Sequence, residues 1–336
     1  MTKKALLFGI TGQDGSYLSE LLLDEGYKVV GVTRRVSTGN TSRISHIMDD
    51  PALDLVEGDI TDYSSVLRIV EESNPDEIYN LAAMSHVGTS FNQPILSIDV
   101  TCTGCLNILE VLREHNSHAR FYQASSSEMF GDAITERDGD LFQDENTLFN
   151  PQSPYAIAKL AAHHATRLYR KSYGLHASCG ILFNHESERR GGRFVTKKIT
   201  KYIARLNQHF LEGGDNGSAP KLHLGNLDAK RDWGHAEDYV KAMWLMVQQD
   251  NPDDYVIATG KTHSVRDFLT ASFDRIGIQD YAEFVVQDPR FMRPSEVPYL
   301  KGDPNKARRV LSWKPEVSFE QLVSRMIDYD IGALKN

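Results

Sequence analysis

A glycine-rich segment near the beginning of the chain constrains the fold more than any other feature. Residues 9–15 read G-x-x-G-x-x-G, between an apolar run at 5–8 and a segment in which Leu18, Leu21 and Leu22 recur at helical spacing. Glycines at this spacing allow a tight turn and a close approach of a pyrophosphate to the helix N-terminus. The segment predicts a dinucleotide-binding unit, although a glycine-rich turn without a ligand would look the same.

Strand-like and helix-like segments alternate along the first half of the chain. A long helix is expected over 95–113, and another over 153–172 with Pro154 at its start, where proline is tolerated. This alternation predicts an α/β fold with a Rossmann-type doubly wound parallel sheet. The expected strands are 5–8, 28–32, 54–57, 77–81, 120–125 and 176–182.

The pattern loosens after residue 183, and 336 residues are enough for two lobes. Residues 1–183 are expected to form the Rossmann domain that binds the dinucleotide, and 235–260 to pack back on it. Residues 184–234 and 261–336 are expected to form a smaller C-terminal α/β lobe that binds the substrate.

Composition and charge disfavour several classes of protein. The net charge of −9 argues against nucleic-acid binding. The N-terminal apolar run is too short for a signal peptide, and no segment is expected to approach the ~18 apolar residues that span a membrane. Three cysteines fit a reducing compartment better than a disulfide scaffold. We therefore expect a cytoplasmic protein with neither nucleic acid nor membrane as partner.

The residues after the second strand indicate which cofactor binds. Thr33 is followed by Arg34 and Arg35, where binders of NAD favour an acid, and two guanidiniums suit a 2′-phosphate. NADP is therefore predicted, with a solvated basic turn as the alternative. Residues after the third and fourth strands are placed to contact the adenine and the ribose. The candidate cofactor residues are Gly9, Thr11, Gly12, Gln13, Asp14, Gly15, Arg34, Arg35, Asp59, Ile60, Leu81, Ala82, Ala83 and Ser85.

A tyrosine and a lysine four residues apart indicate hydride chemistry. Tyr155 and Lys159 lie in the predicted helix 153–172 and project from one face. The ammonium is expected to favour the phenolate and lower the tyrosine pKa, so that Tyr155 takes a hydroxyl proton while a nicotinamide takes the hydride. Such a pair is also common as a packed surface pair, but its position after the fifth strand favours catalysis.

Two polar residues follow the fifth strand, at the edge of the sheet where ligands bind. Ser126 can hydrogen-bond the reacting oxygen. Glu128 can remove a proton from the carbon beside a new ketone, which points to an enzyme that also eliminates water. The alternative is that Glu128 is an exposed acid that caps the next element.

Other motifs in the sequence give no support for metal binding or hydrolase activity. Cys102 and Cys105 form a C-x-x-C without a partner pair, inside an apolar helical run, so packing is the preferred interpretation. The chain has no H-E-x-x-H, and residues 180–191 hold no G-x-S-x-G.

Several of these stretches together resemble the GDP-mannose 4,6-dehydratase family of extended short-chain dehydrogenases. The resemblance rests on 9–15, 121–128, 153–159, 180–187 and 224–234, and it covers essentially the whole chain. It implies that Ser126 stands at the family's catalytic Thr, Glu128 is the acid/base, Tyr155 is the base of the hydride step and Lys159 is its partner. It further implies cofactor and substrate contacts by Asn184, His185 and Arg190, substrate contacts by Ser85, and GDP contacts by Lys198, Arg231, Arg293 and Glu296.

Three departures from the family pattern are visible. Met84 replaces a usual Gln, Glu188 replaces a usual Pro, and the loop around 136–140 is longer. We expect this loop to border the C6 end of the sugar, which keeps a GDP-D-glycero-manno-heptose open beside GDP-mannose as substrate. The resemblance also implies a homodimer or homotetramer, the latter if the loop 34–43 reaches a neighbour's cofactor.

The predicted activity is conversion of the GDP-sugar to its 4-keto-6-deoxy form plus water. It proceeds by C4 oxidation, C5/C6 elimination and hydride return to C6. A nucleotide-sugar 4-epimerase or 4-reductase is the alternative, but neither needs a base at C5 such as Glu128. A non-catalytic nucleotide sensor would need none of Tyr155, Lys159 and Glu128.

Overall fold

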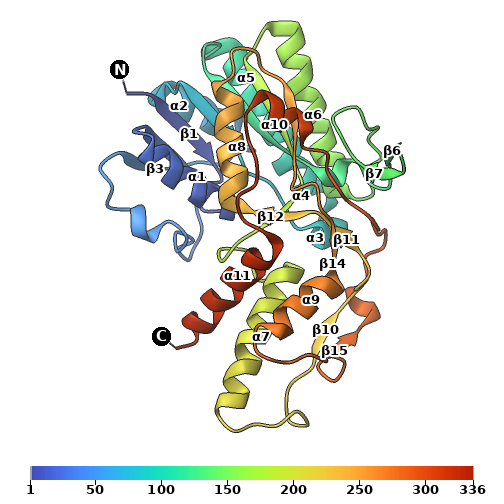
Figure 1. Ribbon diagram of the computed structural model, residues 1–336. Coiled ribbons are helices and arrows are strands. Elements are labelled where there is room, and N and C mark those ends of the chain that lie inside the picture. Colours follow the sequence, from blue (N-terminus) through green and yellow to red (C-terminus); the bar gives the residue numbers. More distant parts are fainter. Residues whose placement is uncertain (1, 336) are drawn as a thin grey trace.

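A seven-stranded parallel sheet forms the centre of the larger lobe in the computed structural model, which describes residues 2–335 (Figure 1). The strand order is β13-β8-β5-β4-β1-β2-β3, and every neighbouring pair is parallel. This confirms the predicted doubly wound fold. The strands are β1 (Lys4–Phe8), β2 (Lys28–Thr33), β3 (Leu53–Glu57), β4 (Glu77–Asn80), β5 (Arg120–Ser126), β8 (Ala177–Leu182) and β13 (Asp254–Ile257).

Helices cover both faces of the sheet because alternate side chains of each strand point to opposite faces. In β1, Ala5 and Leu7 join the core beneath α1 (Gln13–Asp24) and α8 (Ala236–Gln248). Leu6 and Phe8 join the other core. That second core lies beneath α2 (Tyr63–Ser73), α5 (Gly104–His115) and α6 (Pro154–Tyr173).

The long helix predicted over 95–113 is interrupted by a π-helical turn. It divides into α4 (Pro94–Ile98), the π turn η2 (Asp99–Thr103) and α5. The buried Thr101 accepts a hydrogen bond from the Met84 backbone at 3.3 Å, which ties this turn to the loop after β4. Single π turns inside α-helices occur frequently at functional sites.

The stretch Pro94–His115 also corrects an expectation about membranes. It is long and apolar enough, by length and composition, to cross a bilayer, so the expectation that no segment approaches that size is wrong. Its second half is nevertheless a crossover helix between β4 and β5. Ile108, Leu109 and Leu112 are fully buried in the second core.

The smaller lobe lies below the sheet in Figure 1 and has its own core around Trp233 and Phe268. Helix α10 (Asn305–Val310) leaves this lobe, and Ala307 packs in the core beneath α1 and α8. Residues 305–313, assigned to the smaller lobe from sequence, therefore lie against the larger one. The smaller lobe comprises α7 (Val195–Leu211), α9 (Val265–Asp274), α11 (Phe319–Ala333), β10 (Leu222–Leu224) and β15 (Val285–Gln287).

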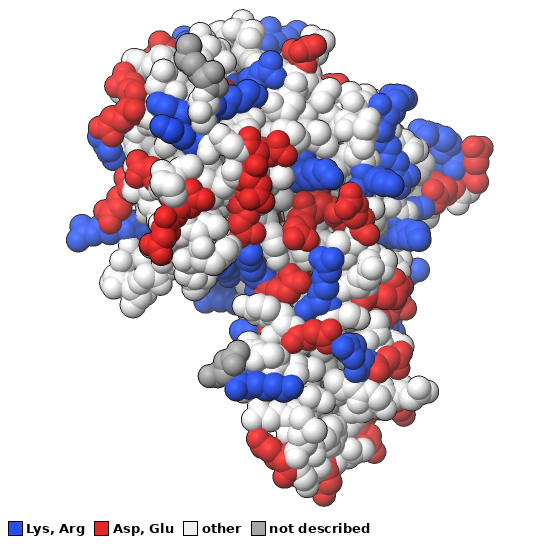
Figure 2. Space-filling view, turned by 60° about the vertical axis from the view of Figure 1, so that its left-hand side comes forward, with Lys and Arg blue, Asp and Glu red and all other residues white. Residues whose placement is uncertain are grey.

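Short two-stranded pairs join the two lobes. β9 (Asn184–Glu186) pairs with β12 (Trp233–His235), and β11 (Lys230–Arg231) pairs with β14 (His263–Ser264). Figure 2 shows acidic and basic side chains interspersed over both lobes on one face, with a narrowing of the molecule between them.

The loop around 136–140 forms a hairpin that packs on the 299–303 segment. β6 (Thr135–Arg137) and β7 (Asp140–Phe142) pair with each other, and Gln143 exchanges backbone hydrogen bonds with residues 301–303. No residue from 129 to 154 lines the main cavity of the described chain. The expectation that this loop borders the C6 end of the sugar is therefore wrong, because the hairpin packs on the 299–303 segment instead.

Candidate active site

A cavity of about 1060 Å³ runs between the two lobes, along the carboxyl ends of the central strands. One wall comes from the ends of β1, β4, β5 and β8, and the other from the smaller lobe. Every candidate residue named from sequence lines it except Arg35, which is exposed. Lining residues from Phe8 to Glu296, 288 positions apart in sequence, are thus brought together at the edge where such sheets bind ligands.

The glycine segment forms a cradle that side chains would fill. A Cβ on Gly9, whose φ is +91°, would lie 3.0 Å from the Ala82 nitrogen, and a Cβ on Gly15 would lie 2.2 Å from the Gly9 carbonyl. α1 begins directly after Gly12, and no side chain caps its first N–H groups. Free N–H groups at a helix N-terminus are suited to a pyrophosphate, so the cradle fits a dinucleotide.

A histidine and an aspartate join the glycine segment to β9. His185 Nε2 lies 2.8 Å from Asp14 Oδ2, and Gln13 Nε2 donates to the His185 carbonyl at 3.1 Å. Burial acts to raise the pKa of Asp14, but the adjacent His185 outweighs it and holds the pKa at about 2. Arg190 Nε lies 2.9 Å from Glu186 Oε2, and its guanidinium stacks on Phe194 at 3.6 Å. This end of the cavity is therefore fixed by ion pairs within the chain.

The loop after β2 returns to its own glycine segment. Arg43 donates to the Thr11 carbonyl at 3.2 Å and to the Arg189 carbonyl at 2.8 Å. Arg34 and Asn40 line the cavity, so one of the two predicted arginines is in reach of a bound cofactor.

The four candidate catalytic residues meet at the end of β5. The hydroxyl of Ser126, the last residue of β5, accepts from the Glu128 backbone at 3.3 Å and so begins the single turn η3 (Ser127–Met129). The Ser153 side chain caps α6 and Pro154 occupies its first turn, which places Tyr155 at the start of the helix. Lys159 Nζ donates to the Ala124 carbonyl at 2.6 Å. All four side chains are buried and line the cavity.

Burial decides the protonation of the tyrosine and the lysine. It raises the pKa of Tyr155 to about 12, with the Glu128 carboxylate acting in the same direction and the Ser126 hydroxyl against it. It also lowers the pKa of Lys159 to about 8. The expectation that the lysine lowers the tyrosine pKa is therefore wrong in this structure. Lys159 Nζ lies 5.9 Å from the Tyr155 ring centre and donates a hydrogen bond to the Ala124 carbonyl.

Cationic side chains gather at the other end of the cavity. Arg293 Nη1 lies 3.4 Å from Glu128 Oε1, and the Arg293 backbone donates to Glu296 Oε1 at 3.1 Å. Arg231 is only 6% exposed and donates to the Lys230 carbonyl. No carboxylate among the described residues lies within ion-pair distance of its guanidinium, and a buried cation without a partner is suited to an anionic ligand.

Several lining residues were missed from sequence. His86 caps α3 (Val87–Asn92), one residue after the predicted Ser85, and could have been found from that position. Arg193 follows the predicted Arg190 by three residues. Arg290 carries no local motif and reaches the cavity only because the 288–296 loop folds over it.

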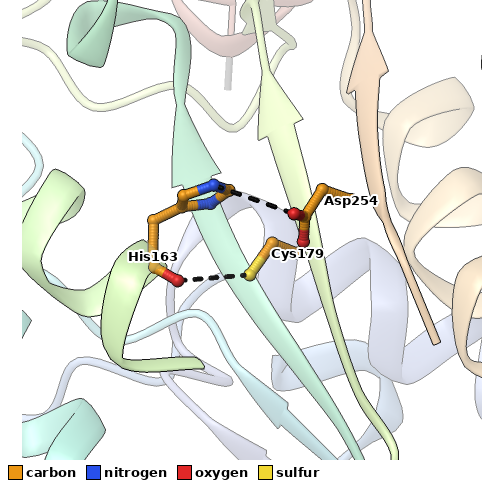
Figure 3. Close-up of side chains that lie close together, drawn as sticks. All are labelled: His163, Cys179 and Asp254. Carbon is orange, nitrogen blue, oxygen red and sulfur yellow. Dashed lines mark hydrogen bonds and ion pairs between the residues drawn. The ribbon is translucent and has the colours of Figure 1, made fainter. Parts of the chain in front are cut away.

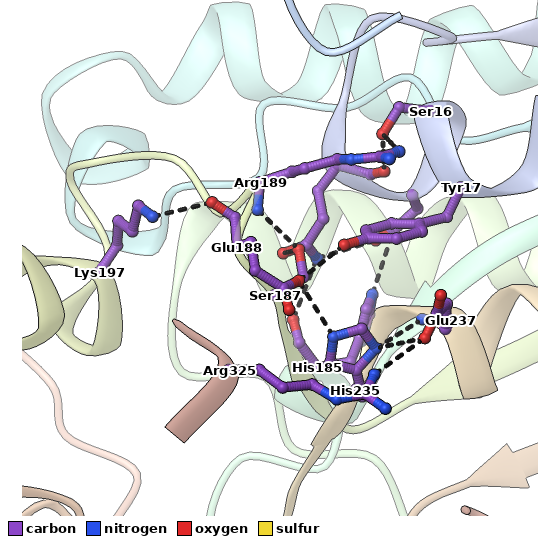
Figure 4. Close-up of polar contacts among 12 residues, drawn as sticks. Ser16, Tyr17, His185, Ser187, Glu188, Arg189, Lys197, His235, Glu237 and Arg325 are labelled. Carbon is purple, nitrogen blue, oxygen red and sulfur yellow. Dashed lines mark hydrogen bonds and ion pairs between the residues drawn. The ribbon is translucent and has the colours of Figure 1, made fainter. Parts of the chain in front are cut away.

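Glu188 connects the cofactor cradle to the smaller lobe (Figure 4). Its carboxylate accepts from Tyr17 at 2.8 Å and from His235 Nε2 at 3.2 Å, so it bridges α1 to the cap of α8. Its backbone carbonyl accepts from Lys197 of α7, which is also paired with Asp330 of α11 at 2.7 Å. Burial acts to raise the pKa of Glu188, but these hydrogen bonds outweigh it and hold the pKa at about 2.

Comparison with known proteins gives matches along nearly the whole chain. The family model described as GDP-mannose 4,6 dehydratase matches residues 6–326. GDP-mannose 4,6 dehydratase 1 of Arabidopsis thaliana is 50% identical, covering 99% of this chain and 91% of that protein. GDP-mannose 4,6-dehydratase of Yersinia enterocolitica is 46% identical, covering 99% and 95%. A solved dTDP-glucose 4,6-dehydratase from Bacillus anthracis, in complex with NAD, shares the fold with a TM-score of 0.82 at 20% identity, covering 98% of this chain and 96% of that one.

Proposed function

The chain belongs to the GDP-mannose 4,6-dehydratase family, and from this premise we propose how its own residues carry out the reaction. It is a lyase that removes water from a GDP-sugar. We propose GDP-mannose as the substrate. The hairpin β6–β7 lies away from the cavity, so it offers no structural support for a heptose.

The convergence of Tyr155, Lys159, Ser126 and Glu128 in one buried cavity is the observation that carries the proposal. The phenolate form of Tyr155, a minor species at neutral pH because burial raises the pKa to about 12, takes the proton of the C4 hydroxyl. Ser126 is hydrogen-bonded to the same oxygen, and Lys159 holds the strand end through Ala124. The glycine cradle and Arg34 would hold a nicotinamide dinucleotide, which would supply the hydride chemistry at C4 and C6 when bound.

Glu128 carries out the elimination. The C4 ketone makes the C5 hydrogen acidic, and the Glu128 carboxylate takes that proton and delivers it to the C6 hydroxyl, which leaves as water. A proton equivalent to the one that Tyr155 removed is then returned at C5. The products are a 4-keto-6-deoxy sugar and one water. C4 is oxidised and C6 is reduced, so the reaction needs no external oxidant or reductant.

We propose NADP as the cofactor, held by the glycine cradle and by Arg34. The exposed guanidinium of Arg34 lines the cavity, and the position after β2 carries no acid to bind a ribose 2′-hydroxyl. Arg35 lies outside the cavity, so a single arginine supports this choice. Charge reversal in Arg34→Asp should weaken NADP binding more than NAD binding, measured by tryptophan fluorescence titration of each dinucleotide.

The diphosphate of the substrate is proposed to bind Arg231, Arg293 and Lys198. Arg231 offers a desolvated guanidinium without a carboxylate partner, and the Lys198 ammonium lies over the Phe291 ring at 4.8 Å. Ser85, Asn184 and Glu296 line the same cavity and are proposed to contact the sugar and the nucleoside.

A mass-spectrometric assay with GDP-mannose and no added reductant tests the proposal. We expect a product lighter by one water, with no net change in NADPH absorbance. Stoichiometric formation or consumption of NADPH would instead indicate a reductase. A product of unchanged mass would indicate an epimerase, and no turnover with any nucleotide sugar would indicate a sensor.

A further inference from the structure

A buried polar cluster lies behind the catalytic end of β5 (Figure 3). It consists of His163 on α6, Cys179 on β8 and Asp254 on β13, and their potential metal-binding atoms lie within 4.8 Å of one another. His163 Nε2 lies 4.0 Å from Asp254 Oδ2, and Cys179 Sγ lies 4.0 Å from the His163 carbonyl. The cluster is not part of the cavity wall described above.

The surroundings of this cluster do not favour a metal ion. Asp254 is already paired with Arg170 at 2.7 Å and with Arg167 at 3.2 Å, so a divalent cation would meet two guanidiniums. Burial raises the pKa of Cys179 well above its usual value, which keeps it a thiol where a metal would need a thiolate. The other ring nitrogen of His163 is engaged elsewhere, because Nδ1 lies 3.0 Å from Ser125 Oγ.

That last contact connects the cluster to the reaction site. Tyr155, Lys159 and His163 are four residues apart and share one face of α6. They face three successive residues of β5. Lys159 donates to the Ala124 carbonyl, His163 contacts the Ser125 hydroxyl, and Tyr155 is within reach of the Ser126 hydroxyl. Each turn of the helix therefore holds one residue of the strand end.

The protonation of His163 follows from its burial. The side chain is 1% exposed, and burial lowers its pKa to about 4, so the imidazole is neutral at physiological pH. The tautomer with its proton on Nε2, 4.0 Å from the Asp254 carboxylate, would make Nδ1 the acceptor for the Ser125 hydroxyl at 3.0 Å. The Phe149 ring packs edge-on at 5.3 Å and restricts rotation of the imidazole.

We propose that His163 is a positioning residue for the dehydration, which acts by holding Ser125 and thereby the direction of the strand end that carries Ser126 and Glu128. Ser125 also lines the cavity, so a freed hydroxyl would turn toward the reacting groups. Misplacing a catalytic group by about 1 Å costs on the order of 100-fold in rate. This inference rests on the proposed roles of Ser126 and Glu128.

Steady-state kinetics of five variants test the proposal. His163→Phe keeps the packing against Phe149 and removes the acceptor for Ser125, while His163→Gln keeps an acceptor. We expect His163→Phe to lower kcat by about 10- to 100-fold, with KM for GDP-mannose changed less than about 2-fold, and His163→Gln to recover most of kcat. The isotope effect with 4-deuterated GDP-mannose should change in His163→Phe, because the misplaced strand end carries both Ser126 of the hydride step and Glu128 of the elimination. The exposed neighbour His164, as His164→Phe, is the matched control and should behave as wild type.

Ser125→Ala provides a second route should His163→Phe not fold, since it removes one oxygen from the same contact. The double variant should be no slower than the slower single variant, because both changes remove one interaction. Full kcat in His163→Phe or Ser125→Ala, or equal losses in His163→Gln and His163→Phe, would overturn the positioning role. An inactive wild type would instead overturn the proposed function.

Discussion

Replacing Glu188 by glutamine should destabilise the junction between the two lobes. The carboxylate of Glu188 is 20% exposed and accepts hydrogen bonds from Tyr17 and from His235 Nε2. Glutamine keeps the shape of the side chain but loses the charge, and its N–H₂ group faces one of these two donors. Glutamine has no titratable group, so the substitution isolates the contribution of the ionised form. We expect Glu188→Gln to unfold more readily than wild type at neutral pH.

The size of the effect follows from the pKa of this carboxyl. Hydrogen bonds from His235 and Tyr17 outweigh burial and bring the pKa from 4.5 to about 2. At about 1.4 kcal/mol per pKa unit, this corresponds to about 3 kcal/mol. Because the folded-state value lies below the ordinary one, the stabilisation is present above pH 4.5 and is lost as the pH falls toward 2. A chain of this size changes its Tm by about 2 °C per kcal/mol, which predicts a loss of about 6 °C at pH 7.

Thermal unfolding by circular dichroism, at pH 7 and again near pH 3, measures this effect. Glu237→Gln is the matched control, because Glu237 also contacts His235, at 3.5 Å, but is 55% exposed and should cost about 0–1 kcal/mol. The difference between wild type and Glu188→Gln should shrink by about half near pH 3. Equal Tm values at pH 7, or a difference that does not change with pH, would refute the reasoning.

Three further predictions concern the cavity. Glu128→Gln should lower kcat by about 10²–10⁴-fold and abolish deuterium exchange at C5 in D₂O. Glu136→Gln, on the exposed hairpin, is the control and should change neither quantity. A fully active Glu128→Gln variant would exclude Glu128 as the base. Arg231→Met should raise KM for GDP-mannose by about 10²-fold and leave NADP affinity unchanged in titrations; an unchanged KM would remove it from the diphosphate site. Gly15→Ala should purify without dinucleotide by absorbance, because its Cβ would meet the Gly9 carbonyl at 2.2 Å, while Gly39→Ala, with nothing within 4 Å, should retain it.

Local sequence patterns predicted the sheet and the positions of the site residues because both depend on short-range regularities. The strand–glycine–helix order around Gly9 and the four-residue spacing of Tyr155 and Lys159 determine which side chains reach the carboxyl edge of the sheet. The same local patterns did not predict the features that depend on packing between distant segments. The longer loop after Glu128 is expected from sequence to border the sugar, yet it forms a hairpin that packs on residues 299–303, over 150 positions away.

The sign of the pKa shift at Tyr155 could not be predicted either. Spacing correctly put an ammonium near the phenol, but the pKa depends on the balance between that charge and desolvation by every element around the ring. Burial of both groups outweighs their proximity, raising the pKa of Tyr155 and lowering that of Lys159. A sequence motif therefore identifies the pair, whereas its electrostatics are a property of the assembled cavity.

The pairing of Glu128 with Arg293 shows most clearly what the meeting of the lobes adds. Sequence named Glu128 as the base and Arg293 as a diphosphate ligand, two separate tasks 165 positions apart. In the folded chain the two side chains lie 3.4 Å apart. Arg293 therefore contacts the proposed base and also belongs to the proposed diphosphate subsite. It links binding of the nucleotide to the position of Glu128. Substitution of Arg293 should therefore change kcat and KM together, whereas the more distant Arg231, which forms no ion pair with Glu128, should act mainly on KM.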